Sequence, residues 1–200
     1  MKIYREIFLL FCLVTIFPPL SDAGELKLPT YGVGDKELLV FTDYFCPPCM
    51  KMETELSPAL KKALEGGGWR VTFVDIPGHQ DTPLFARYFI YAVQGGKGYK
   101  NALAARDILF ALARQGKGYK EKDLEEAFKR NGVRFKVVDP WPVYKEWNRL
   151  MEEHKISGTP TCILKEAGLS TTVFDGSKAI RERLLPLLIV NPPPKEVKKK

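Results

Sequence analysis

Cys46 and Cys49 are separated by two residues, a spacing that lets two thiols interchange between dithiol and disulfide forms. The segment from Glu37 to Phe45 is rich in Leu, Val, Phe and Tyr, which is typical of a buried strand. From Met50 to Leu64, leucines at helical spacing predict a helix. Pro47 stands where a helix begins, because proline presets φ and needs no N–H there. Cys46 is therefore expected at a helix N-terminus.

A helix N-terminus suits a reactive thiol. Free backbone N–H groups and the positive end of the helix dipole favour the thiolate of Cys46 over its thiol. Cys49 lies one turn further along the helix and can reach the same sulfur. We expect Cys46 to be the exposed, reactive thiol and Cys49 to be the shielded one. The pair therefore predicts a dithiol/disulfide switch.

Other uses of the two cysteines depend on the rest of the chain. A zinc site would need a second pair of cysteines or histidines at ligand spacing, and beyond the pair and Cys12 of the leading apolar run the chain offers Cys162 and two scattered histidines. A carrier of Cu(I) could use Cys46, Cys49 and Cys162 as thiolate ligands. A structural disulfide or a non-catalytic adaptor are further alternatives. Cys162 lies in an apolar run and is expected to be a buried small hydrophobe.

The composition is that of one globular domain, with 200 residues of which 45% are hydrophobic. Residues 1–23 are similar to a signal peptide. Lys2 and Arg5 precede an apolar run from Ile7 to Phe17, and Ser21-Asp22-Ala23 offers a small-residue cleavage site. The run is shorter than the roughly 20 residues that span a bilayer, although an uncleaved anchor is the alternative. Export to the periplasm, an oxidising compartment, is therefore predicted.

The folded domain is expected over residues 24–190. Residues 191–200 are predicted to form a disordered basic tail, because Asn191-Pro192-Pro193-Pro194 cannot join a helix or a central strand. The net charge of +7 includes the lysines of this tail. For an exported chain, a solvated tail is a better interpretation than a nucleic-acid site.

The remaining pattern predicts a strand–helix–strand unit, a helical block over about 79–155, and a hairpin followed by a helix. Pro58 is expected to kink or break the first helix, because it donates no N–H. The first two strands should be parallel, joined by a right-handed crossover. The expected strands are 38–45, 69–76, 157–164 and 169–174, and the later helices are 82–94, 99–114, 121–131, 142–154 and 178–188.

Two motifs together resemble a known family. Val40-Phe41-Thr42-Asp43 leads into Cys46-Pro47-Pro48-Cys49, and Gly158-Thr159-Pro160-Thr161 follows after the helical block. This order is similar to that of the thioredoxin-fold disulfide-bond (Dsb) oxidoreductases, above all the catalytic domains of DsbC and DsbG. The helical block lies between the second strand and the strand that Pro160 opens. DsbA, DsbC and DsbG carry a helical insertion at the same place. The resemblance covers Leu38 to Leu188 and implies an α/β thioredoxin fold with a helical insertion between the second strand and the cis-proline strand.

The resemblance also implies site residues. Cys46 takes the position of the nucleophile and Cys49 that of the resolving cysteine. Pro160 takes the position of the cis-proline, and Thr159 would offer its backbone to an extended substrate. The residues agree with this, because a proline that opens a strand after Gly158 is a plausible place for a cis bond.

The chain departs from the family in three respects. Few residues precede the first strand, so the N-terminal dimerisation domain of DsbC and DsbG is not expected and a monomer is predicted. Val40 stands where thioredoxin and DsbA carry an acid. The nearest acid, Asp43, is either a modulator of the cysteines or a solvated strand end. His79 and His154 are assigned no chemistry.

The third departure lies between the cysteines. Pro47 and Pro48 lack N–H groups, so the donors left near Cys46 are those of Cys49 and Met50, and no histidine adds positive charge. Both prolines are therefore possible modulators, and a reductase or isomerase is slightly favoured over an oxidase. The expected activity is thiol–disulfide exchange with exported proteins. It needs no cofactor and no metal, but it does need a redox partner, which we expect in the membrane.

Overall fold

A computed structural model describes residues 28–116 and 118–190. The predicted signal peptide over residues 1–23 and the predicted basic tail over residues 191–200 both lie outside the described residues. Within the described part of the chain, no helix combines the length and the apolar character needed to cross a membrane.

Five strands form one mixed sheet in the order β1-β3-β2-β4-β5. The central pair, β2 and β3, is parallel, and Thr42 at the end of β2 lies beside Asp75 at the end of β3. The other three pairings are antiparallel, including the predicted hairpin of β4 and β5. The strands are β1 (Thr30–Tyr31), β2 (Lys36–Thr42), β3 (Trp69–Asp75), β4 (Thr161–Glu166) and β5 (Thr172–Asp175).

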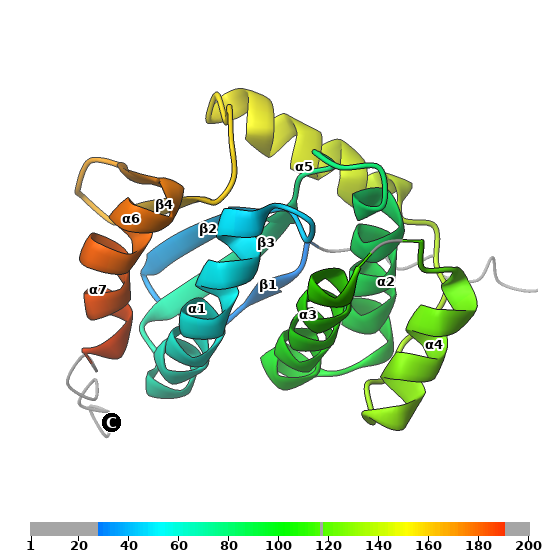
Figure 1. Cartoon of the computed structure of the whole chain (residues 1–200). Coiled ribbons are helices and arrows are strands. Elements are labelled where there is room, and N and C mark those ends of the chain that lie inside the picture. The colour runs from blue at the N-terminus through cyan, green and yellow to red at the C-terminus, as the bar shows by residue number, and fades with distance from the viewer. Residues whose placement is uncertain (1–27, 117, 191–200) are drawn as a thin grey trace, which may run out of the picture.

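Helix α1 (Pro47–Gly66) connects β2 to β3 and packs on one face of the sheet, with α3 beside it (Figure 1). The predicted helical block is present as four helices between β3 and β4. They are α2 (Thr82–Gly95), α3 (Gly98–Gln115), α4 (Glu121–Arg130) and α5 (Trp141–Glu153). After α5, the ring of His154 contacts Phe41 near the end of β2, with ring centroids 6.4 Å apart. The insertion therefore packs against the sheet near the end where α1 begins.

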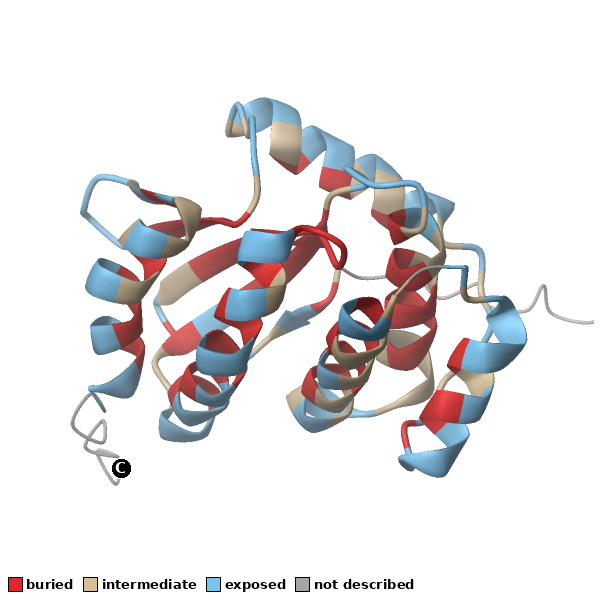
Figure 2. Cartoon of the chain, in the orientation of Figure 1, coloured by how far each residue is buried: buried red, intermediate tan, exposed pale blue. Residues whose placement is uncertain are grey.

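The core lies between the strands and the inward faces of the helices (Figure 2). Leu38, Val40 and Phe41 of β2 are fully buried, as the apolar run predicts. In α1 the buried positions recur at helical spacing, so one stripe of the helix faces the sheet while the opposite side faces solvent.

Several predicted boundaries are wrong, and the strands expected over 157–164 and 169–174 begin later, as β4 (Thr161–Glu166) and β5 (Thr172–Asp175). The first strand ends at Thr42 and not at Phe45, because Asp43 turns the chain: its carboxylate accepts the N–H of Phe45 at 2.9 Å and its carbonyl accepts the N–H of Cys46 at 3.2 Å. Helix α1 does not break at Pro58 but continues to Gly66. Packing of a buried apolar stripe on both sides of the proline outweighs the lost hydrogen bond.

The last helix is present but irregular. It consists of α6 (Gly176–Ala179), the π-helical segment η1 (Ile180–Leu184) and α7 (Leu185–Ile189). The π-helical segment precedes Pro186, which cannot donate to the turn before it. Leu184, Leu185 and Leu188 point inward and are buried, as predicted.

Candidate active site

The two cysteines lie at the start of α1, where the sequence predicts them. Cys46 is the residue before the first helical residue, and its backbone is extended, with φ −76° and ψ 117°. Pro47 and Pro48 occupy the first two helical positions, are exposed, and leave no N–H there. The N–H of Met50 donates to the carbonyl of Cys46 at 3.0 Å. Of the two donors expected near the Cys46 sulfur, Met50 is therefore already used, and Cys49 remains.

Both thiols are free, and Cys46 is more enclosed than the sequence suggests. Cys46 keeps 7% of its surface exposed, so the expectation of an exposed thiol is wrong in degree, whereas Cys49 is 0% exposed. Burial raises the pKa of the Cys49 thiol well above its usual range. The predicted order of accessibility, Cys46 before Cys49, holds in the structure.

The strand-opening proline lies directly beside the dithiol. The Thr159–Pro160 peptide bond is cis, as the sequence analysis expects. The Cys46 thiol donates to the carbonyl of Thr159 over 3.3 Å, across 113 positions of sequence. Thr159 is half-buried and Pro160 is buried, and the N–H of Gly176 donates to the Pro160 carbonyl at 2.9 Å. The fold thus brings together the two motifs that carry the resemblance.

Asp43 is buried at the turn that leads into Cys46, with 1% exposure. One carboxylate oxygen, Oδ1, accepts the N–H of Phe45 at 2.9 Å and the hydroxyl of Thr82 at 2.6 Å. The other, Oδ2, lies 2.7 Å from Nδ1 of His79. Asp43 is therefore not a solvated strand end, and it ties the turn before Cys46 to the segment between β3 and α2.

The contact between His79 and Asp43 is one that the sequence analysis missed. A signal for it existed, because β2 and β3 are parallel neighbours whose carboxyl ends meet at one edge of the sheet. Asp43 follows β2 directly, and His79 follows β3 after Pro77-Gly78. Two polar residues in these places are expected to lie close together.

These features can be compared with known proteins. No family model and no curated protein matches the sequence. Among solved structures, ScsC of Proteus mirabilis in a transitional conformation aligns over 81% of this chain and 70% of its own, with a TM-score of 0.60 and 20% identity. A periplasmic thioredoxin-like protein from Salmonella enterica serovar Typhimurium aligns over 81% of this chain and 87% of its own, with a TM-score of 0.58 and 20% identity.

A third neighbour is the thiol-disulfide exchange protein alpha-DsbA2 from Wolbachia pipientis. It aligns over 80% of this chain and 87% of its own, with a TM-score of 0.50 and 16% identity. The chain has the thioredoxin fold. The resemblance to Dsb-type proteins that the two motifs predict is thereby confirmed for the fold, including the helices between β3 and the cis-proline strand.

In this thioredoxin fold, Cys162 lies on β4 beside Val40 of β2 and is 0% exposed. Burial raises the pKa of its thiol well above the usual range, as expected for a small buried hydrophobe. Among residues 28–116 and 118–190, no three His, Cys, Asp or Glu side chains gather so that they could hold a metal ion.

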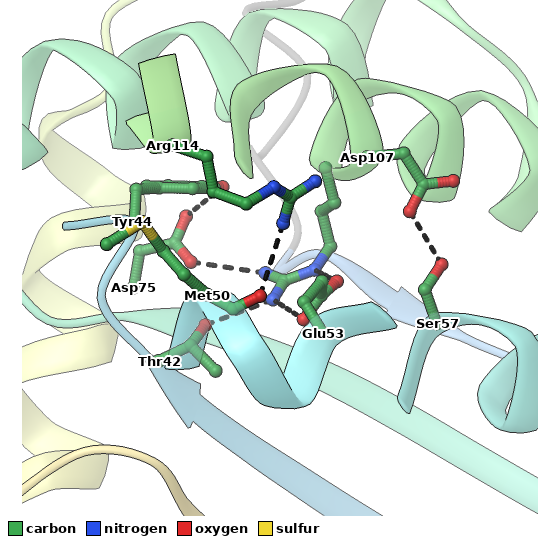
Figure 3. A network of polar contacts seen from close by, with 9 residues as sticks. Thr42, Tyr44, Met50, Glu53, Ser57, Asp75, Asp107 and Arg114 are labelled. Atoms are coloured by element: carbon green, nitrogen blue, oxygen red, sulfur yellow. Dashed lines mark hydrogen bonds and ion pairs between the residues drawn. The ribbon is translucent and has the colours of Figure 1, made fainter. Parts of the chain in front are cut away.

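A buried charge network under α1 is the second feature that sequence reasoning missed (Figure 3). Arg106 of α3 has a fully buried side chain that binds both carboxylate oxygens of Glu53, at 3.1 and 3.2 Å. It also donates to Asp75 of β3 at 3.2 Å and to Thr42 of β2 at 3.0 Å. Glu53, one turn after Cys49 on α1, is therefore a buried acid close to the helix start that carries the dithiol.

Asp75 is the member of this network whose pKa departs from its usual value. Its second oxygen accepts the hydroxyl of Tyr44 at 2.9 Å. Burial, opposed by the charge of Arg106, raises the pKa of Asp75 from 3.8 to about 6. Within this network one guanidinium, that of Arg106, faces two carboxylates, those of Glu53 and Asp75.

Proposed function

We propose that the protein is an exported thiol:disulfide oxidoreductase that exchanges disulfides with other exported proteins through Cys46 and Cys49. The observation that carries this proposal is the position of Cys46, which lies at the start of α1 and faces the Thr159 carbonyl at 3.3 Å. The name of one fold neighbour, a thiol-disulfide exchange protein, agrees with it.

The chemistry needs only these two sulfurs. The Cys46 thiolate attacks a client disulfide, forms a mixed disulfide and releases one client sulfur as a thiolate. Cys49 then loses its proton and attacks the Cys46 sulfur, which frees the second client thiolate and leaves Cys46 and Cys49 joined. The chain is thereby oxidised by two electrons and the client reduced. A thiol-bearing redox partner, which we place in the membrane, restores the dithiol.

Thr159 and Pro160 are proposed to receive the client. The Thr159 carbonyl and the half-buried backbone around it offer main-chain partners to an extended segment beside Cys46. Asp43, Pro47 and Pro48 are proposed as modulators of the dithiol. A reductase or isomerase role is favoured over a primary oxidase, because two prolines remove first-turn N–H donors and Met50 uses its own.

The decisive experiment measures disulfide exchange directly. The purified mature chain is equilibrated with glutathione buffers, and its ability to catalyse insulin reduction by dithiothreitol is assayed. We expect one two-electron transition of the Cys46–Cys49 pair and a clear acceleration that Cys46→Ala abolishes. An inert wild-type chain would refute the proposal in favour of an adaptor. Stoichiometric copper on the reduced protein would instead support the carrier.

Export is part of the proposal. The apolar run Ile7–Phe17 and the small residues before Gly24 support a signal peptide over residues 1–23, and the periplasmic thioredoxin-like neighbour is consistent with it. Fusing residues 1–30 to a reporter that is active only outside the cytoplasm should give activity. Replacing Leu9 and Leu10 by Asp should abolish the activity if the run directs export.

A further inference from the structure

His79 is the solvent-facing partner of a buried carboxylate next to the dithiol. Its side chain is 45% exposed, whereas that of Asp43 is 1% exposed. His79 Nδ1 lies 2.7 Å from Asp43 Oδ2, and the opposite oxygen of the same carboxylate holds the N–H of Phe45, the residue before Cys46. The imidazole is thus two hydrogen bonds away from the turn that carries the Cys46 sulfur.

The contact between His79 and Asp43 is close, and neighbouring residues restrict the movement of the Asp43 carboxylate. A Cβ added to Gly78 would lie 2.6 Å from Asp43 Oδ2, so a side chain at position 78 would push the carboxylate aside. Thr82 closes the other side through its 2.6 Å hydrogen bond to Asp43 Oδ1. Between them, His79 and Thr82 fix the rotation of the carboxylate, and that rotation decides whether Oδ1 stays on the Phe45 N–H.

We propose that His79 is a positioning residue for the dithiol. Its Nδ1–H orients the Asp43 carboxylate, which holds the turn from Asp43 to Cys46, and this turn presents the Cys46 sulfur to the Thr159 carbonyl. The inference rests on the proposed function for its biological meaning.

Three variants test the role. His79→Ala removes the donor, His79→Asn keeps an N–H at the place of Nδ1 without a cation, and Gln80→Ala is a matched control at the next exposed loop position. For each, we measure the rate at which iodoacetamide alkylates Cys46 in the reduced chain, the equilibrium with glutathione, and the urea midpoint. Alkylation needs no client, so it reports on positioning even if insulin reduction fails.

We expect His79→Ala to slow alkylation of Cys46 about fivefold, the value of one net hydrogen bond, and to shift the glutathione equilibrium towards the disulfide form by a similar factor. His79→Asn should stay within about twofold of the wild type, as should Gln80→Ala. Thr82→Val, which removes the other side-chain donor to the carboxylate, should repeat the effect of His79→Ala.

Two results would overturn the proposal. One is a His79→Ala variant with wild-type alkylation and glutathione equilibrium, whatever its urea midpoint, since that would leave His79 with a stabilising role alone. The other is an equal loss in His79→Asn and His79→Ala, which would mean that the Nδ1–H donor is not what acts. If His79→Ala does not fold, the test rests on the other two variants: wild-type alkylation in Thr82→Val, or a loss of about fivefold in His79→Asn, would then overturn the proposal. A wild-type chain inactive on insulin would refute the proposed function and leave this test intact.

Discussion

Burial separates the two thiols of the motif. Cys46 retains 7% exposure and Cys49 none, and burial raises the pKa of Cys49. Limiting iodoacetamide on the reduced chain should therefore label Cys46 at least about tenfold faster than Cys49, because a raised pKa leaves little thiolate. Peptide mapping measures the ratio, and preferential labelling of Cys49 would contradict it.

The two cysteines should also differ in the mixed disulfides that they form. Cys49→Ala should accumulate mixed disulfides with clients, whereas Cys46→Ala should not.

Pro48 is the position at which charge can be added most simply, because it is exposed at the second helical residue. Pro48→His should make the chain a stronger oxidant, with a glutathione equilibrium shifted about fivefold towards the dithiol, since a nearby cation favours the thiolate. Pro48→Gln restores the N–H without charge and separates the two contributions. An unchanged or opposite shift in Pro48→His would refute the argument.

Cys162 should affect stability and not redox chemistry. It is fully buried on β4, and it belongs to no group of three potential metal ligands among the described residues. Cys162→Ala should leave the glutathione equilibrium of Cys46–Cys49 unchanged within about twofold and lower the free energy of unfolding by about 1 kcal/mol, because a small cavity remains. A large change in that equilibrium would show that Cys162 takes part in the redox reaction.

At the scale of elements, Arg106 joins the insertion to the thioredoxin core. From α3 it binds Glu53 of α1, Asp75 of β3 and Thr42 of β2, whose side chains are labelled in Figure 3. Its guanidinium carbon also lies 4.4 Å from the centroid of the Phe73 ring. These contacts hold α3 against the helix that carries the cysteines. The buried ion pairs thus link three elements that are distant in sequence.

Arg106→Met should be strongly destabilising. It keeps the apolar volume but leaves two buried carboxylates without their cation, so we expect a loss of about 3–5 kcal/mol in urea unfolding at pH 7. Arg114→Met is the matched control on the same helix, because Arg114 is exposed and its guanidinium donates to the Met50 carbonyl at 3.2 Å. Its loss should stay below about 1 kcal/mol. Equal losses in the two variants would contradict a special role for Arg106.

At the scale of the whole molecule, Asp75 makes global stability depend on pH. Its pKa is about 6 when folded and 3.8 ordinarily, so the folded chain holds the proton over a range in which the unfolded chain has lost it. Its contribution to the free energy of unfolding is greatest below pH 4, falls as the pH rises, and is constant above the folded pKa.

Asp75→Asn removes this titration. The unfolding free energy of the wild type, minus that of Asp75→Asn, should therefore fall by about 2 kcal/mol from about pH 4 to about pH 7, most of the energy of a shift of roughly two pKa units. Urea titrations of both proteins across this range measure the difference. A difference that stays constant, or that increases with pH, would show that Asp75 is ionised throughout in the folded state.

The sequence by itself determined the elements whose causes are local. Proline at the start of α1, leucines at helical spacing and the four amphipathic helices of the insertion are short-range patterns, and the structure contains all of them. Cys46 and Cys49 at the helix start and the burial of Cys162 also follow from neighbouring residue types, whereas the cis bond before Pro160 was implied by the resemblance to the Dsb family. Together, the Cys-Pro-Pro-Cys and Gly-Thr-Pro-Thr motifs were enough to indicate the thioredoxin fold.

Tertiary structure decided what depends on residues distant in sequence. Only the parallel pairing of β2 and β3 brings His79 to Asp43, and only the packing of α3 on α1 buries Arg106 between Glu53 and Asp75. The same packing keeps α1 continuous across Pro58. Short-range patterns do not contain these results, because the partners of a buried polar group are chosen by which elements meet in space, and the energy of burying a charge unpaired makes that choice strict.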